Sequence, residues 1–374
     1  MIKKSKRTYS NQMQKRNALK FVYVTRHFNH SGFLILKKLI DLDVKPIAVI
    51  LEKKEDPYLN RIIRPFAIIW YYLKCWFYRC PPIKTLTSEE LLAKAHSIPI
   101  IKIKTMRDDE FVRTLSNIEP DLMVLGGGWH ELIPEVVFQM PKLGCINTHP
   151  SLLPEFRGTS ITRWQRLYGV HKSGVSIHYV NENFDTGEII MQKSINVSPN
   201  ISPQELFRQL GNLGAEMIPD LLVRFSNEGH LPIINIENNS QYYRYFRRWK
   251  WDSENLKIDF SKPLSDIHYF ISANTQESYQ YLGPICRING MEYLIRESGL
   301  IDFSPEFLQE TRSYNSDVGI VFIKNGYLYL YRENEEYFLE IRRIQKYDRF
   351  FKFRRSNTPD KFLKNNKPVE IEAL

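Results

Sequence analysis

Short apolar runs that alternate with helical patterns are the feature that most limits the fold of this 374-residue chain. Each run has the length and the β-branched or aromatic content of a buried strand. Apolar residues at helical spacing follow the first run, between Phe33 and Ile40. This alternation predicts βαβ units and an α/β fold with a Rossmann-like, mostly parallel sheet. The expected strands are residues 20–25, 44–51, 98–103, 121–125 and 144–147.

The C-terminal third has a different pattern. Ser202 followed by Pro203 and Glu205 predicts a helix start, and the helix is expected to run to Leu222. Beyond a Gly-, Pro- and Asn-containing stretch, short alternating segments at 326–331 and 337–341 predict a smaller β-rich domain. The expected organisation is a basic tail at 1–19, an α/β domain at 20–228 with an insertion at 53–98, a linker at 229–241 and a β-rich C-terminal domain at 242–374.

Composition narrows the class of protein. The chain is 43% hydrophobic and 25% charged, typical of a globular protein, which argues against disordered and collagen-like classes. The net charge of +10 gathers at the two ends, which leaves the body slightly acidic; such ends either contact an anionic surface or lie in solvent. Four cysteines are too few for a disulfide scaffold, and the polar N-terminus does not resemble a secretion signal, so a cytoplasmic location is expected.

An aromatic stretch at 62–80 lies inside the insertion. It is interrupted by charged residues, and its longest uncharged run is 66–73. A membrane-spanning helix needs about 20 apolar residues, so no transmembrane segment is expected here. Two interpretations stay open: a segment that lies in a membrane interface, or a helix that packs on the domain or on a partner subunit.

Polar side chains of the types that take part in catalysis cluster at the end of the fifth expected strand. Asn147 and His149 are two residues apart, so both side chains project to the same side of an extended chain. Asp185 follows another expected strand at 175–180, and its carboxylate can reach the imidazole if that strand returns beside the first. Amide and imidazole donors stabilise an oxyanion, and a histidine held by a carboxylate moves protons. The three residues therefore suit acyl transfer to an amine, although a lone histidine at a strand end is more often structural, and Asn and Asp in turns commonly satisfy backbone groups.

The motif INTHPSLLPEFRG followed by FDTGEII resembles the formyltransferase family, which includes methionyl-tRNA, glycinamide ribonucleotide and nucleotide-sugar formyltransferases. The resemblance covers residues 20–225 and is strongest at 121–192. It implies the formyltransferase fold and an enzyme that uses N10-formyltetrahydrofolate as formyl donor. It further implies that Asn147 and His149 stabilise the oxyanion, while Asp185 keeps His149 protonated or oriented and accepts the proton of the amine.

The segment LGGGWHEL at 125–132 resembles the folate-lining loop of the family. By this resemblance, Gly128, Trp129, His130 and Leu132 are the cofactor-binding residues. No metal is expected, because the histidines and cysteines lack the spacing of a metal site. The segment before Asp185 also contains His178, whose place inside or outside the pocket stays open.

The resemblance leaves the acceptor amine open. Glycinamide ribonucleotide enzymes are short single-domain chains, so the C-terminal domain argues against that class. The loop after the first strand, TRHFNH, differs from the Gly-Thr-Pro loop typical of the tRNA enzymes. A nucleotide-linked amino sugar is therefore the favoured small-molecule partner, with methionyl-tRNA as the alternative in which nucleic acid is bound. Formyltetrahydrofolate hydrolysis, a non-catalytic binding protein and a homodimer also stay open.

Aromatic and arginine residues interleave at 242–251, YYRYFRRWKW. Such a segment can stack on bases or ribose rings, and it can equally pack as a basic hinge between domains. Its sequence is compatible with both roles.

Overall fold

The computed structural model describes most of the chain. The described residues are 19–26, 29–53, 88–236, 241–250, 256–275, 283–309, 314–316, 318–347, 357–361, 363, 369 and 371–372. The expected basic tail, except Leu19, and the aromatic stretch at 62–80 lie outside them.

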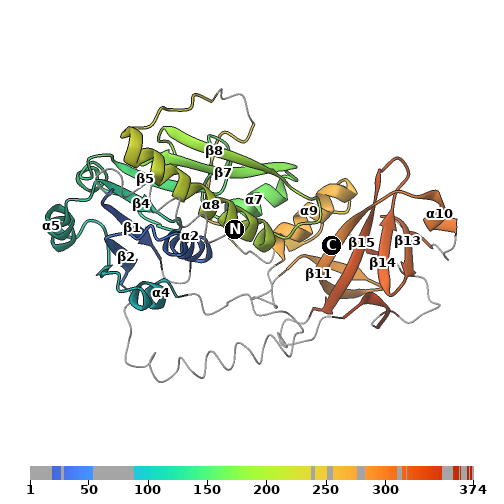
Figure 1. Cartoon of the computed structure of the whole chain (residues 1–374). Helices are drawn as coiled ribbons and strands as arrows, with labels where there is room; N and C mark the ends of the chain where they lie inside the picture. The colour runs from blue at the N-terminus through green and yellow to red at the C-terminus, as the bar shows by residue number, and fades with distance from the viewer. Residues whose placement is uncertain are drawn as a thin grey trace, which may run out of the picture.

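A seven-stranded sheet forms the N-terminal part (Figure 1), with the order β3-β2-β1-β4-β5-β7-β8. The first five of these strands in the order are parallel, whereas β7 runs antiparallel to both of its neighbours, β5 and β8. The fold-class prediction is confirmed. The strands are β1 (Phe21–Thr25), β2 (Ala48–Glu52), β3 (Ile100–Ile103), β4 (Leu122–Leu125), β5 (Cys145–His149), β7 (Lys172–Tyr179) and β8 (Ile189–Asn196).

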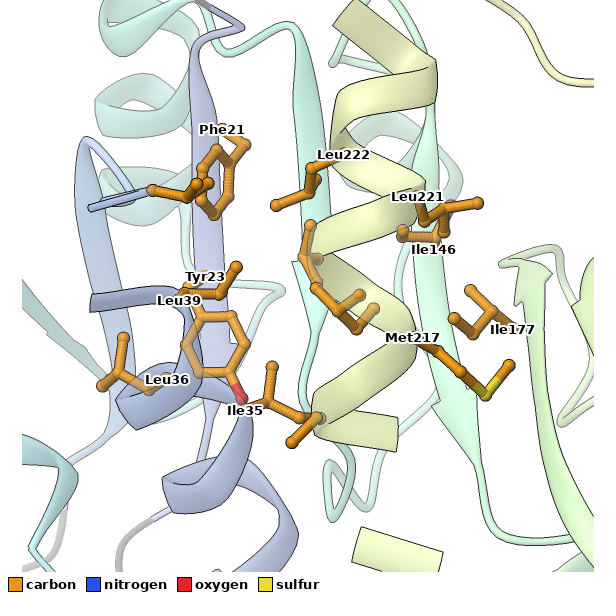
Figure 2. Close-up of a cluster of buried hydrophobic side chains, with 14 of the residues drawn as sticks. Phe21, Tyr23, Ile35, Leu36, Leu39, Ile146, Ile177, Met217, Leu221 and Leu222 are labelled. Carbon is orange, nitrogen blue, oxygen red and sulfur yellow. The ribbon is translucent and has the colours of Figure 1, made fainter. Parts of the chain in front are cut away.

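Alternation along the strands supplies two separate apolar cores. Phe21 and Tyr23 of β1 point to one face, where α2 (His30–Asp41) and α8 (Pro203–Glu228) pack (Figure 2). Val22 and Val24 point to the other face, covered by α5 (Asp109–Ile118) and α6 (Glu135–Phe138). Both faces of the sheet are buried, which is why the central strands are continuously apolar.

Helix α8 begins where the sequence predicts. The Ser202 hydroxyl accepts a hydrogen bond from the Glu205 N–H at 3.1 Å, and Pro203 occupies the first turn. The helix continues past the expected end at Leu222 to Glu228, with Pro219 buried inside it. Among the described residues, no helix is both long enough and apolar enough to cross a membrane.

The C-terminal part contains a second, antiparallel sheet in the order β12-β13-β14-β15-β11-β10-β16. Its strands are β10 (Ile285–Ile288), β11 (Met291–Asp302), β12 (Tyr314–Ser316), β13 (Gly319–Lys324), β14 (Tyr327–Tyr331), β15 (Tyr337–Lys346) and β16 (Ile371–Glu372), and the short helix α10 (Pro305–Gln309) lies between β11 and β12.

Helix α9 (Leu264–Asn274) joins the two parts, because it packs on α7 (Ile161–Leu167) and on β11 (Figure 1). Asn200 adds two hydrogen bonds to the main chain of Leu300, at 2.7 and 3.0 Å. The residue limits of the two domains stay a prediction.

Candidate active site

A cavity of about 640 Å³ lies at the carboxyl ends of β1, β4 and β5. The loops that follow these strands line it, together with the turn between β7 and β8 and one face of α8. The strand order reverses between β1 and β4, and ligands of α/β sheets bind at such a switch point. The position of the cavity thus follows from the topology of the sheet.

The three predicted catalytic residues meet in this cavity. Nδ1 of His149 lies 3.3 Å from Oδ1 of Asp185, and Nδ2 of Asn147 donates to the same oxygen at 3.4 Å. Asp185 lies in the turn after β7 with a φ of 54°. The next glycine, Gly187, lies against the main chain at the end of β7. A Cβ on Gly187 would lie 1.7 Å from the carbonyl oxygen of Tyr179.

The surroundings of His149 favour a charged imidazole. Its Nδ1 faces the Asp185 carboxylate, and its Nε2 lies 2.9 Å from the carbonyl oxygen of Phe156. Both oxygens only accept hydrogen bonds, so a ring protonated on both nitrogens satisfies both contacts. Burial lowers the pKa of His149. The nearby Asp185 carboxylate and the hydrogen bonds to Asp185 and to the Phe156 carbonyl raise the pKa by more than burial lowers it, so it lies above its ordinary value.

Asp185 is held as a carboxylate. Burial raises its pKa, but the positive charge and hydrogen bonds of His149, with a smaller part from His178, bring the pKa well below the ordinary range. Its Oδ2 accepts a hydrogen bond from the Gly158 N–H at 2.9 Å. Gly158 has a φ of 112°, and a Cβ there would lie 2.2 Å from the Phe246 carbonyl oxygen, so glycine is required.

The loop after β4 forms a second wall of the cavity. Gly128, Trp129, His130 and Leu132, the residues predicted to bind folate, all line it. Glu131 fixes the loop: its carboxylate accepts hydrogen bonds from the hydroxyl of Thr105 and the N–H of Met106, each at 2.7 Å, and from Nε1 of Trp129 at 3.3 Å. The wall offers a half-buried indole, apolar side chains and glycine backbone, which suits a flat heteroaromatic ring. Its contact with folate stays a prediction.

A third wall comes from the segment 241–250. There β9 (Tyr245–Phe246) pairs in parallel with β6 (Arg157–Gly158). The rings of Tyr242 and Phe246 stack on Phe156, with centroid distances of 4.8 and 5.0 Å.

Two side chains of this segment, Tyr245 and Arg248, line the cavity. The Tyr245 ring is 43% exposed and lies 6.1 Å from the ring of Phe184, which is 36% exposed. Within the described part of the chain, the Arg248 guanidinium forms no hydrogen bond or ion pair.

Comparison with protein families identifies the domain that holds this cavity. Residues 80–222 match the family described as Formyl transferase. The chain carries a formyl transferase domain. The matched residues include the three predicted catalytic residues and the loop after β4, whereas β1, β2 and the segment 241–250 lie outside the match.

Sequence relatives and solved structures resemble this chain in different ways. It is 33% identical over 190 residues to the methionyl-tRNA formyltransferase of Clostridioides difficile, an alignment that covers 51% of this chain and 58% of that relative. The chain therefore spans less than two thirds of that protein. The N-formyltransferase from Helicobacter canadensis, solved with folinic acid and dTDP-3-aminofucose, shares the fold with a TM-score of 0.57, 19% identity and coverage of 86% of this chain and 98% of its own. The sugar 3N-formyl transferase WlaRD, solved with dTDP and 5-N-formyl-THF, has a TM-score of 0.55, 18% identity and coverage of 86% and 97%.

One buried residue of the formyl transferase domain was not assigned from its sequence. His178 is paired with Asn147 across β5 and β7, its Nε2 lies 3.2 Å from Nδ2 of Asn147, and it is 3.7 Å from Oδ1 of Asp185. Its Nδ1 lies 2.7 Å from the Tyr179 carbonyl oxygen, which only accepts, so this nitrogen donates, while Nε2 faces both the Asn147 amide and the Asp185 carboxylate. His178 thus lies against both Asn147 and Asp185 at the base of the site. The antiparallel register between the two strands is the signal that identifies it.

Proposed function

We propose that this protein transfers the formyl group of N10-formyltetrahydrofolate to a primary amine on a nucleotide-linked amino deoxysugar. The observation that carries the transfer chemistry is His149, whose two ring nitrogens both face oxygen acceptors beside the Asp185 carboxylate. A buried, charged imidazole at the cavity wall stabilises negative charge that develops on a formyl oxygen.

The reaction assigns a role to each of the three predicted catalytic residues. The amine nitrogen forms a bond to the formyl carbon, and the bond from that carbon to N10 of the donor breaks. The positive charge of His149 and the amide of Asn147 stabilise the oxyanion that exists between these two events; His149 acts through its charge, since its two ring N–H groups face Asp185 and Phe156. Asp185 holds the positive charge on His149 and takes the proton that the amine loses, directly or through water, and a proton returns to N10 as tetrahydrofolate leaves. Together these steps consume one amine and release one formamide.

The third wall supports a nucleotide-linked acceptor. Tyr245 and Phe184 present two exposed rings next to the catalytic Asp185, and Arg248 adds a cation on the same side. Rings of this kind stack on a nucleobase or a sugar, and a guanidinium pairs with phosphate. The two sugar N-formyltransferases named above also match this chain over 86% of its length, which extends well beyond the family match.

The test uses the full chain with N10-formyltetrahydrofolate and three acceptors: dTDP-linked 3-amino and 4-amino deoxysugars and initiator methionyl-tRNA. Release of tetrahydrofolate is followed by absorbance, and the formylated product is identified by mass. We expect turnover with a nucleotide sugar. Arg248→Ala should raise the KM for that sugar about tenfold and leave the donor KM unchanged. Arg247→Ala is the matched control, because Arg247 is adjacent and exposed but lies outside the cavity lining.

Methionyl-tRNA is the second candidate acceptor. Its support is the sequence similarity, since the curated relatives that match at 30–36% identity include several methionyl-tRNA formyltransferases. Turnover with the tRNA alone would select this candidate and reject the sugar. Release of tetrahydrofolate and formate without any amine would instead indicate a hydrolase, and binding without turnover would indicate a non-catalytic protein.

A further inference from the structure

The buried carboxyl group of Glu89 contacts Asn29, just before α2. Glu89 is fully buried at the first position of α4 (Glu89–Ala95), and its Oε1 accepts a hydrogen bond from the main-chain N–H of Asn29 at 2.8 Å. The next residue, Glu90, faces the other way and pairs with the surface residues Lys94 and Lys102. Two consecutive carboxylates on one helix thus have different tasks, and the one at position 89 points to the loop beside the cavity.

Asn29 links Glu89 to the loop after β4, across the switch point between β1 and β4. Its Oδ1 accepts the N–H of Gly32 at 2.9 Å and caps α2, while its Nδ2 donates to the carbonyl oxygen of Gly127 at 3.2 Å. A Cβ on Gly128 would lie 1.9 Å from that same Nδ2, so the two loops approach as closely as glycine permits. Asn29, Gly127 and Gly128 all line the cavity.

A second carboxylate reinforces the same two loops. Glu52, at the end of β2, accepts a hydrogen bond from Nε of Arg26 at 2.9 Å and lies 3.8 Å from Nε2 of His130. Arg26 in turn donates to the carbonyl oxygen of Gly128 at 3.4 Å. Glu52 and Glu89 therefore both act on the loop after β1, and through it on the loop after β4. Of the two side chains, Glu89 is fully buried, so water does not compete for its hydrogen bond to Asn29 as it can for that of Glu52.

We propose that Glu89 is a positioning residue for the formyl-donor wall, acting through Asn29 on the Gly127–Gly128 backbone. The buried Glu89 oxygen accepts the Asn29 N–H, and this contact holds the Asn29 main chain where the Asn29 amide meets Gly127. Without it the two loops separate at the point where the donor ring is expected to lie. The identity of the ligand rests on the proposed function, whereas the coupling of the two loops does not.

The test compares Glu89→Gln with Glu90→Gln as matched control in the 374-residue chain. Binding of 5-formyltetrahydrofolate, a donor analogue that needs no acceptor, is measured by calorimetry. We expect Glu89→Gln to weaken this binding about 5- to 10-fold and to raise the donor KM equally, because an NH₂ group, which cannot accept a hydrogen bond, replaces one of the two buried carboxyl oxygens. The kcat should stay within about twofold, since Glu89 does not touch the reacting atoms. Glu90→Gln should behave as the parent protein in each assay.

A double-mutant cycle separates positioning from a general loss of structure. Asn29→Asp keeps the cap on α2 and the main-chain bond to Glu89, but it removes the donor to Gly127. If Glu89 acts through Asn29, the losses of binding in the double variant are smaller than the product of the single losses. Hydrogen exchange at the Asn29 amide should rise in Glu89→Gln without a change in the α8 amides.

Two results would overturn the positioning role: donor binding in Glu89→Gln equal to that of Glu90→Gln, or losses in the cycle that simply multiply. Failure of the proposed function has a different signature, because the parent protein would then bind the donor analogue but formylate none of the amines offered.

Discussion

Replacing Asp185 with asparagine tests the electrostatic pair at the centre of the site. The backbone tolerates this change, because asparagine adopts a positive φ such as the 54° of Asp185 readily. The carboxylate has one oxygen on His149 and Asn147 and the other on the Gly158 N–H. In either orientation of the new amide, its NH₂ group faces one of these donors.

The size of the effect follows from these contacts. A buried donor left without an acceptor costs about 1–3 kcal/mol, so the free energy of unfolding at pH 7 should fall by that amount. In the wild-type site the Asp185 carboxylate raises the pKa of His149 and so offsets the lowering by burial. Without this carboxylate, the pKa of His149 should fall below its ordinary value. With the charged imidazole lost from the site, the rate of transfer should fall about 10²- to 10³-fold at pH 7.

The assay is the rate of tetrahydrofolate release as a function of pH. Transfer that needs a protonated His149 falls as the pH rises through its raised pKa, and this alkaline limb should move to lower pH in Asp185→Asn. Stability follows the same pair. The raised pKa of His149 contributes stability that is complete below about pH 6.5, and the lowered pKa of Asp185 contributes stability that is complete above about pH 4. The difference in stability between the two proteins should therefore be largest between these values.

Glu182→Gln is the control, since Glu182 lies exposed in the same turn and outside the cavity lining. An alkaline limb that stays at the same pH in Asp185→Asn, with a rate close to that of Glu182→Gln, would refute the coupling of Asp185 to His149.

Three further changes probe the frame around the site. Gly158→Ala should lower the acceptor kcat/KM at least about tenfold, because the new Cβ meets the Phe246 carbonyl oxygen and disturbs the β6–β9 pairing; unchanged steady-state kinetics would contradict this. Ser202→Ala should lower the free energy of unfolding by about 1 kcal/mol through the lost cap of α8 while kcat is kept, as thermal melts and initial rates would report. Burial lowers the pKa of His268 to about 4, so the parent protein should lose stability as the pH falls from about 6.5 towards 4, where the unfolded chain takes up the proton first. His268→Gln should flatten this acid slope in pH-dependent melts, and an unchanged slope would exclude His268 as its source.

The sequence predicted those parts of the fold that depend on local pattern. The central strands were found because both of their faces are buried, so nearly every residue is apolar. The second strand begins at Ala48 rather than Val44, because Pro46 has no N–H to offer a neighbouring strand. Helix α8 was located by its cap but runs beyond Leu222, where the apolar pattern that packs on the sheet continues to Phe225.

The site was predictable only where it depends on short spacing. Asn147 and His149 share a side of β5 because they are two residues apart, and the approach of Asp185 needed only the return of one strand. His178 required the β5–β7 register, which no local pattern contains. Tyr245 and Arg248 reach the cavity through a pairing between β6 and β9 that joins segments distant in the sequence. Their composition alone was compatible with a hinge as well as with a ligand surface.

The β6–β9 pairing is made by main-chain atoms, and the apolar anchor Phe246 alternates with the cavity residue Tyr245. Substitutions at the exposed positions of this segment thus leave its attachment intact. The predicted catalytic residues lie elsewhere, within β5 and the turn before β8. If the proposed function holds, selection can alter which amine is admitted while His149 and its partners stay constant, so divergence among such proteins is expected at Tyr245 and Arg248 before it reaches His149.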